Sequence, residues 1–349
     1  MSELKDFKCP NCGGRLEFDT KSQKLKCPYC DGTFDPEIFD EDDHYVVDGE
    51  TWDDENVLVY TCKSCGGTIM ADRNTAATSC PYCGNPVVMT SNVSGIYKPK
   101  RVIPFKFDKK QAKEKYREFL RGKTLLPREF TSEAVIDEIK GIYVPFWIFG
   151  GKANARMWFD ATRNRYWSDA NYNYVETSYY KLFRSGSVNF ADVPVDASSK
   201  ISDELTESVE PFDISAAREF TDNYLAGFLA DKYDINVEES RDKANSRIAN
   251  STTSLFASTT SMYDTCVPSS SSIMINQGRQ EYVMYPMWLL NIKYRGKMYT
   301  FAMNGQTGKF VGNLPLDKKA LGRGKWKFAA ILAAALFVGL TLLETFLLK

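Results

Sequence analysis

The longest hydrophobic stretch of the chain lies at its C-terminal end. Residues 328–348 are apolar except at four positions, one of which is Glu344. A helix of this length spans about 32 Å, enough to cross the roughly 30 Å hydrocarbon core of a bilayer. A buried core helix is the alternative, but a soluble helix of this size normally shows a polar face, and Glu344 is close enough to the end to reach the headgroups. The pattern predicts one transmembrane helix over residues 328–348.

Positive charge is concentrated on one side of this predicted helix. A basic juxtamembrane segment at residues 316–327 precedes it, and Lys349 follows it. The basic residues of the segment are Lys318, Lys319, Arg323, Lys325 and Lys327. Because basic flanks stay in the cytoplasm, we expect a single-pass, tail-anchored protein of the cell membrane with its bulk in the cytoplasm. The same segment can hold anionic headgroups.

The middle of the chain combines helical and strand patterns in two successive copies, residues 96–210 and 211–315. In the first copy, apolar positions with helical spacing predict helices over residues 109–121 and 131–140. A strand is expected to follow over residues 143–149. This order of elements predicts an α+β fold.

The second copy repeats this order. Asp213 is expected to cap a helix with a regular apolar stripe. The stripe consists of Phe220, Tyr224 and Phe228. A polar helix over about residues 237–256 and a strand over residues 285–290 are expected to follow. The middle region is therefore predicted to be a duplicated α+β unit rich in antiparallel strands, and repeats of this size usually serve structure rather than catalysis.

The first copy also contains, after its predicted strand, a region rich in Trp, Tyr and Phe. Its ring-bearing segments are residues 157–159, 166–167, 172–174 and 179–180. The pattern predicts β-hairpins with rings on both faces. Cross-strand ring packing is the favoured explanation because few basic residues flank the rings, and a stacking surface for bases is the alternative. If the rings are exposed, they mark a contact with a protein or a membrane surface.

Eight of the nine cysteines form two matched sets near the N-terminus. Each set has two Cys-x-x-Cys pairs separated by 14 residues, and the sets are offset by 53. Their members are Cys9, Cys12, Cys27, Cys30, Cys62, Cys65, Cys80 and Cys83. Two such turns bring four thiolates to one tetrahedral site, the geometry of structural zinc, with no position open to a substrate. We expect two four-cysteine zinc ribbons, residues 1–38 and 57–95, each stabilised mainly by one Zn²⁺ ion.

Two other interpretations of the cysteines are weaker. Disulfide-bonded hairpins require an oxidising compartment, whereas the N-terminus has no signal-peptide pattern and the predicted tail places these residues in the cytoplasm. A redox Cys-x-x-Cys motif predicts one pair rather than four. Cys266 has no partner in either set and is expected to be a free thiol rather than a nucleophile.

Charge narrows the range of partners. The chain has 44 basic and 45 acidic residues, but its first 100 residues hold 17 acids against 10 bases. An acidic linker at residues 39–56 separates the ribbons, and two four-thiolate zinc sites add about two negative charges each. Because phosphate contacts need Lys and Arg, this surface disfavours nucleic acid and favours a protein partner with a basic face. The acids can also simply solvate the linker.

The sequence offers no recognisable enzyme site. The single histidine, His44, lies in an acidic run, so a Ser-His-Asp triad has no other histidine to use. Residues 304–309 resemble a phosphate loop, but two residues separate the glycines instead of four, and Phe310 stands where Ser or Thr is required. Asn304-Gly305 predicts a β-turn instead. Without a nucleotide-binding loop, and with closed zinc sites, the chain is predicted not to be an enzyme.

The chain resembles a bacterial family of membrane-anchored double-zinc-ribbon proteins. The similarity rests on both cysteine sets and on residues 78–84, 143–147, 193–196 and 304–312, and with the terminal anchor it covers most of the chain. Members are often labelled replication-restart helicases or transcription-factor-type zinc-ribbon proteins. The helicase label reflects the ribbons alone, because no motor motif is present. The resemblance implies a role beside phage-shock-protein-A-like and stomatin-like proteins, as a membrane recruiter in envelope stress.

Together these patterns predict a zinc-ribbon adaptor that recruits partner proteins to the inner face of the membrane. Tethering raises the local concentration of a bound partner without new contacts, and the ribbons with the acidic linker are the expected docking surface. The alternative is a membrane-tethered nucleic-acid-binding protein that assists transcription or replication. Self-association of the chain is left open by the sequence.

Overall fold

The computed structural model describes residues 2–6, 8–36, 46–47, 57–61, 68–72, 75–79, 86–89, 99–123 and 126–315. These residues form a mixed α+β fold with one large sheet and few helices. The α-helices are α2 (Lys109–Leu120), α3 (Glu133–Ile136), α4 (Asp203–Val209) and α5 (Val237–Ser258), and the 3-10 helices are η2 (Arg128–Thr131), η3 (Ile214–Ala216) and η4 (Asp222–Leu225). The α+β class expected from the sequence is confirmed.

The strands divide between the N-terminal region and the body. The N-terminal strands are β1 (Ser2–Asp6), β2 (Glu17–Asp19), β3 (Lys24–Lys26), β4 (Thr33–Phe34), β5 (Val46–Val47), β6 (Val57–Thr61), β7 (Thr68–Asp72), β8 (Thr75–Ser79) and β9 (Pro86–Met89). The others are β10 (Arg101–Val102), β11 (Lys140–Ser168), β12 (Asn173–Asp196), β13 (Arg218–Glu219), β14 (Leu229–Asp231), β15 (Thr265–Tyr294), β16 (Lys297–Asn304) and β17 (Phe310–Gly312). Through β14, which pairs with both β11 and β8, strands β8, β9, β1 and β5 join the large sheet.

No helix among the described residues combines the length and the hydropathy that crossing a bilayer requires. Residues 316–327 and 328–348, which carry the predicted basic segment and transmembrane helix, lie outside the described residues. The membrane anchor and its orientation therefore stay predictions.

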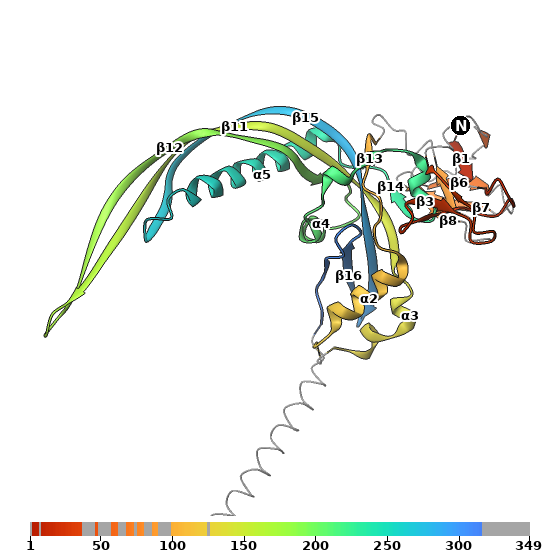
Figure 1. Ribbon diagram of the computed structural model, residues 1–349, viewed down its shortest axis with the longest axis horizontal. Helices are drawn as coiled ribbons and strands as arrows, with labels where there is room; N and C mark the ends of the chain where they lie inside the picture. Colours follow the sequence, from red (N-terminus) through yellow and green to blue (C-terminus); the bar gives the residue numbers. More distant parts are fainter. Residues whose placement is uncertain are drawn as a thin grey trace, which may run out of the picture.

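Three very long strands dominate the sheet. β11 is central, with β15 antiparallel along one edge as far as Thr162 and β12 antiparallel along the other edge as far as Ser168. Their outer parts leave the body and curve away from it (Figure 1). We call this extension the arm and define it as residues 151–168 of β11, 173–190 of β12 and 265–277 of β15. The aromatic region, expected to form several β-hairpins, is instead one long hairpin, β11–β12.

The arm begins where glycines let the strands bend. Both pairings of β11 shift register between Phe149 and Gly151, which is a bulge. A Cβ on Gly151 would lie 2.9 Å from the carbonyl oxygen of Asn276, and one on Gly150 would lie 3.2 Å from that of Ala191. Neighbouring backbone therefore occupies the space that a side chain needs, and only glycine fits this bend.

Helix α5 lies along the concave face of the arm (Figure 1). Its N-terminus is capped by Asn236, whose side chain accepts a hydrogen bond of 2.9 Å from the Glu239 N–H. The buried stripe of α5 consists of Val237, Ser240, Ala244, Ile248, Thr252 and Phe256. Phe256 packs with Met157 and Phe159 of β11 in a separate core cluster. Small residues on this stripe let the helix approach the sheet closely, and the polar helix expected over residues 237–256 is confirmed.

The core of the body is built around aromatic rings. Phe105 stacks on Phe228 at 4.1 Å between centroids and meets Tyr143 and Trp288 edge-on at 5.0 and 5.3 Å. Phe105 and Tyr143 are fully buried. Helix α2 packs beside them through Ala112, Tyr116 and Leu120.

The loop between β16 and β17 is a turn, as expected, and not a phosphate loop. The Asn304 side-chain oxygen accepts hydrogen bonds of 2.9 Å from the N–H groups of Gln306 and Thr307. The Asn304 amide donates in turn to the carbonyl oxygens of Val209 and Pro211 at 3.0 Å. The Asn304 side chain therefore stabilises the turn and its packing on the neighbouring backbone, and it is not directed at a ligand.

Two expected helices differ from the structure. The segment after Asp213 contains η3, β13 and η4 instead of one helix. Phe220, Tyr224 and Phe228 are buried nevertheless, because an irregular chain following the sheet edge brings them to the core at a spacing that imitates a helix. In the first copy, the helix expected over residues 131–140 shortens to α3, since β11 already begins at Lys140.

Asp196, at the inner end of β12, predicts a pH-dependent stability. It is 6% exposed, and burial raises the pKa of its carboxyl from 3.8 to about 7, although the Ser198 N–H partly opposes this. The protonated carboxyl stabilises the fold fully below about pH 4, and this stabilisation is lost as the pH rises to about 7. Over that range the free energy of unfolding falls by at most about 1.4 kcal/mol per pH unit. We expect Asp196→Asn to abolish this slope.

Urea denaturation of the full chain in detergent at several pH values between about 4.5 and 8 measures the effect of Asp196→Asn. The exposed neighbour Asp192 provides the matched control, and Asp192→Asn should keep the slope of the unmodified chain. An Asp196→Asn variant with an unchanged slope would show that this carboxyl does not titrate as described.

Candidate metal centre

The first cysteine set lies in a small three-stranded unit, residues 8–36, which we call ribbon 1. Strands β2, β3 and β4 form its antiparallel sheet. One cysteine pair precedes β2 and the other connects β3 to β4. Leu16, Phe18 and Leu25 are its large buried apolar side chains. With so few apolar residues, the ribbon needs a further source of stability.

The four sulfur atoms of ribbon 1 converge. The Sγ atoms of Cys9, Cys12, Cys27 and Cys30 all lie within 4.8 Å of one another. Cys9 and Cys30 are 3.5 Å apart, as are Cys12 and Cys27. A tetrahedral Zn²⁺ with Zn–S bonds of about 2.3 Å requires sulfurs about 3.8 Å apart. The cluster therefore fits a metal ion of that size with only small adjustments.

Both cysteine pairs share the same backbone arrangement. Around the first pair, Cys9 N donates to Gly14 O at 2.7 Å and Gly13 N donates to Cys9 O at 2.8 Å. Around the second, Cys27 N donates to Gly32 O and Asp31 N to Cys27 O, both at 2.9 Å. Two equivalent turns thus present their sulfurs to one point.

The glycines after Cys12 have separate roles. Gly13 has a φ of +69°, in the left-handed region that favours glycine. A Cβ on Gly14 would lie 2.7 Å from the ring of Tyr29 in the other turn. The pair therefore closes the first turn and leaves room for the second.

Ribbon 1 stabilises thiolate at one cysteine and disfavours it at another. At Cys27 burial opposes ionisation, but the N–H groups of Cys30 and Tyr29 and the neighbouring thiols lower the pKa to about 7. At Cys30 the Gly32 N–H favours ionisation, but the hydrogen bond shared with Cys9 and burial raise the pKa to about 12. Four sulfurs this close ionise together only beside a cation, which is what a bound metal supplies.

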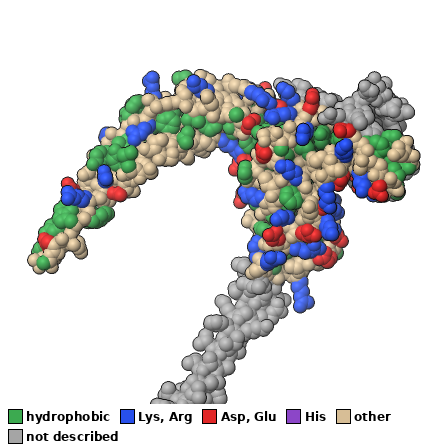
Figure 2. All heavy atoms as spheres, in the orientation of Figure 1, with side chains coloured by type: hydrophobic (Ala, Val, Ile, Leu, Met, Phe, Trp, Pro, Cys, Tyr) green, Lys and Arg blue, Asp and Glu red, His purple; other side chains and the backbone are tan. Residues whose placement is uncertain are grey.

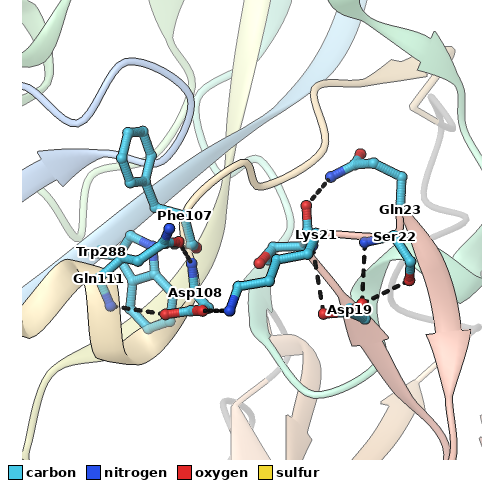
Figure 3. Close-up of polar contacts among 9 residues, drawn as sticks. Asp19, Lys21, Ser22, Gln23, Phe107, Asp108, Gln111 and Trp288 are labelled. Atoms are coloured by element: carbon cyan, nitrogen blue, oxygen red, sulfur yellow. Dashed lines mark hydrogen bonds and ion pairs between the residues drawn. The ribbon is translucent and has the colours of Figure 1, made fainter.

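Ribbon 1 is fixed to the body near the start of α2 (Figure 3). Gln23 donates its side-chain amide to the carbonyl oxygen of Phe105, the central core residue, at 2.9 Å. Lys21 pairs with Asp108 at 3.4 Å, and the same Asp108 caps α2 through the Gln111 N–H at 2.7 Å. The turn between β2 and β3, which is the β-turn of ribbon 1, therefore rests on the body.

A second set of contacts holds ribbon 1 to η4. Phe18 N donates to Ala226 O at 3.1 Å, and the rings of Phe18 and Tyr224 are 5.2 Å apart. The buried Asn223 amide donates to the carbonyl oxygen of Pro36. The sequence pattern did not reveal this docking, since the partners are at least 187 positions apart in the chain and form ordinary apolar and amide contacts.

The metal end of ribbon 1 faces away from these contacts. Cys9 and Cys27 are buried, whereas Cys12 and Cys30 are exposed. Tyr29, beside Cys30, is 71% exposed. Four protein sulfurs would fill every coordination position of a tetrahedral ion bound here, so such an ion would hold the structure together but would not bind a substrate.

The second cysteine set lies outside the described residues, as do His44 and most of the acidic linker. Cys62 and Cys65 fall between the paired strands β6 and β7, and Cys80 and Cys83 fall between the paired strands β8 and β9. Cys266 lies on β15 opposite Ala161, in the arm, and is free.

Fold and site define a mixed α+β protein in which a four-cysteine ribbon able to hold a metal is fixed to a body with a long β arm. The chain is 32% identical over 312 residues to the uncharacterized protein YdjG of Bacillus subtilis strain 168, covering 89% of this chain and 90% of that protein. It therefore belongs to the YdjG family. No protein-family model and no solved structure matches the chain.

Proposed function

We propose that the chain is a tail-anchored zinc-ribbon adaptor that recruits partner proteins to the cytoplasmic face of the bacterial membrane. In this proposal both cysteine sets bind structural Zn²⁺, and residues 328–348 form the anchor. The resemblance to membrane-anchored double-zinc-ribbon proteins adds phage-shock-protein-A-like or stomatin-like proteins as the partners, in envelope stress.

One observation carries this proposal: ribbon 1 is fixed to the body by one end and presents its metal end to solvent. The contacts of Gln23, Phe18 and Asn223 hold the β-turn side. The exposed side carries Tyr29, a residue type that often anchors protein interfaces. A rigid, closed metal site of this kind supports display of a surface rather than catalysis.

The charge of ribbon 1 favours a protein partner over nucleic acid. Residues 8–36 contain five bases and four acids, and a four-thiolate zinc site adds about two negative charges. Three of the bases already form ion pairs, Arg15 with Glu17 at 2.9 Å, Lys26 with Asp31 at 3.0 Å and Lys21 with Asp108. Few cations are left to contact phosphates.

Affinity capture of the full chain from detergent-solubilised membranes, followed by mass spectrometry, tests the proposal. We expect Tyr29→Ala to keep the metal and to lose the captured partner, because the ring lies at the presented end. Lys24→Ala, at an exposed position at the start of β3, beside the β2–β3 turn, is the matched control and should capture the same partner.

Two results would contradict the adaptor proposal. One is the same set of proteins captured by the unmodified chain, by Tyr29→Ala and by Cys27→Ser. The other is a salt-dependent gel shift of nucleic acid by the full chain, which would favour the nucleic-acid alternative.

A further inference from the structure

The outer end of the arm is a ribbon of only two strands. β15 accompanies β11 only as far as Thr162, and α5 ends at Ser258. Residues 163–178, which we call the tip, therefore have no third strand beside them among the described residues. Tip strands pair only with each other, from Arg163↔Ser178 to Ser168↔Asn173.

The tip exposes aromatic and apolar side chains on both faces. Its exposed members are Tyr166 (69%), Trp167 (46%), Tyr172 (68%), Tyr174 (38%) and Val175 (58%). Figure 2 shows such hydrophobic side chains along the arm and toward its end. Paired residues share a face and successive residues alternate, so Tyr166 with Val175 lies on one face and Trp167, stacked on Tyr174 at 5.5 Å, lies on the other.

Apolar rings on both faces fit a lipid surface better than a single protein surface. A docked protein typically covers one face of a two-stranded ribbon, whereas lipid headgroups and upper acyl chains surround both. Trp and Tyr are the residues that concentrate at membrane interfaces, because their rings are apolar and their N–H or O–H groups stay hydrated. Arg165 lies over the Trp167 ring at 5.7 Å, at the base of the tip, where it can reach phosphates.

The charged residue in the turn limits the depth of contact. Asp169 accepts hydrogen bonds of 2.8 Å from the N–H groups of Asn171 and Tyr172 and from the Tyr174 hydroxyl. These bonds hold the pKa of the Asp169 carboxyl below its usual value, so it stays ionised. An ionised turn belongs among headgroups and not in hydrocarbon.

The arm curves toward the side of the molecule from which the anchor is expected to leave. In Figure 1 the tip bends down to nearly the level at which the coloured ribbon ends, just below α2. The 34 residues after Pro315 contain the predicted anchor. One flat membrane on this side can meet both the anchor and the tip.

The root of the arm is held rigidly. Glu281 on β15 is 4% exposed and accepts two hydrogen bonds from Arg101 of β10, at 2.6 and 3.0 Å. Arg279 pairs with the same carboxylate. These ion pairs and the glycine bend fix the direction in which the arm leaves the body.

We propose that the tip, residues 163–178, inserts its rings into the headgroup layer of the bilayer that holds the anchor, as a second membrane contact. This inference rests on the membrane anchor of the proposed function. The two contacts would hold the body and ribbon 1 at a fixed height and orientation over the membrane. The tip carries two bases and two acids, so its contact should depend little on lipid charge.

Fluorescence quenching of the full chain tests the proposal. The chain is reconstituted into vesicles whose phosphatidylcholine or phosphatidylglycerol carries bromine atoms on the upper acyl chain. The emission of a single tryptophan is obtained by subtracting the spectrum of its Trp→Phe variant from the spectrum of the unmodified chain. We expect the emission of Trp167, obtained in this way with Trp167→Phe, to be quenched in both lipids.

Trp158→Phe provides the matched control. Trp158 is 42% exposed, nearly the same as Trp167, and it rests on Phe183 at 4.7 Å. It lies nine positions back along β11, about 30 Å at roughly 3.3 Å per residue, so its emission should escape quenching.

Three outcomes separate the tip from the anchor. If the chain stays on the vesicles in alkaline carbonate but Trp167 is not quenched, the tip proposal is wrong and the anchor stands. If the chain washes off, the anchor of the proposed function fails and the tip proposal fails with it. If Trp167 becomes protected only when a captured protein is added, the tip is a protein contact and the lipid proposal is overturned.

Discussion

Removal of the metal from the full chain is expected to unfold ribbon 1 while the body stays folded. Ribbon 1 has three strands of two or three residues each and three large buried apolar side chains. A structural Zn²⁺ contributes about 10–16 kcal/mol of apparent binding free energy in small zinc domains, far more than this core can supply. The body keeps its own aromatic core around Phe105.

Hydrogen exchange of the full chain, before and after treatment with a strong chelator, measures this unfolding. The N–H groups of Cys9, Gly13, Cys27 and Asp31, which are hydrogen-bonded within the turns, should lose protection. Cys27→Ser should have the same effect without a chelator, and Cys266→Ser, on β15, should have none. Protection that persists in the metal-free chain would mean that ribbon 1 folds without a metal.

Truncation of the central ring, Phe105→Ala, is expected to cost about 3–5 kcal/mol of stability, because removal of a fully buried phenyl leaves a cavity. Phe105 is fully buried and contacts the rings of Phe228, Tyr143 and Trp288. Its carbonyl also receives the Gln23 side chain, so the cavity lies where ribbon 1 rests on the body. Phe105→Ala should therefore destabilise both the body and ribbon 1.

Urea denaturation of the full chain in detergent, followed by far-UV circular dichroism, measures this loss as a lower midpoint. Tyr179→Ala is the control, since Tyr179 is 81% exposed and its change should stay within about 0.5 kcal/mol. If the free energy of unfolding of Phe105→Ala is less than about 1 kcal/mol below that of the unmodified chain, the central role of this ring is contradicted.

Local signals were sufficient for some parts of the structure. The spacing of Cys9, Cys12, Cys27 and Cys30 specifies two equal turns, and the four sulfurs do converge. Asn304-Gly305 specifies a turn, and the polar helix expected over about residues 237–256 forms as α5. Each of these features depends on residues close together in the sequence.

Other parts depend on contacts that local patterns do not contain. Phe220, Tyr224 and Phe228 are spaced like the face of a helix, yet they reach the core from irregular chain. The length of β11, 29 residues, far exceeds the five or six typical of a strand, and only its pairing with β12 and β15 maintains it. The docking of ribbon 1 needs Asn223 and Ala226, which no cysteine motif points to.

The aromatic region contains both packed rings and exposed rings, the two arrangements that its composition allowed. Near α5, the inward residues Met157 and Phe159 pack as core. Farther out, the rings of the tip are paired across the strands but remain exposed. The sequence alone could not separate the two cases, because the difference is where α5 and β15 end.

The metal content of the full chain, purified in detergent without added metal, tests the central claim most directly. Elemental analysis should find two zinc ions per chain, one of them lost in Cys27→Ser and neither lost in Cys266→Ser. Fewer than one zinc ion per chain, or a Cys27→Ser variant that keeps the full metal content, would contradict an account built on paired four-sulfur zinc centres.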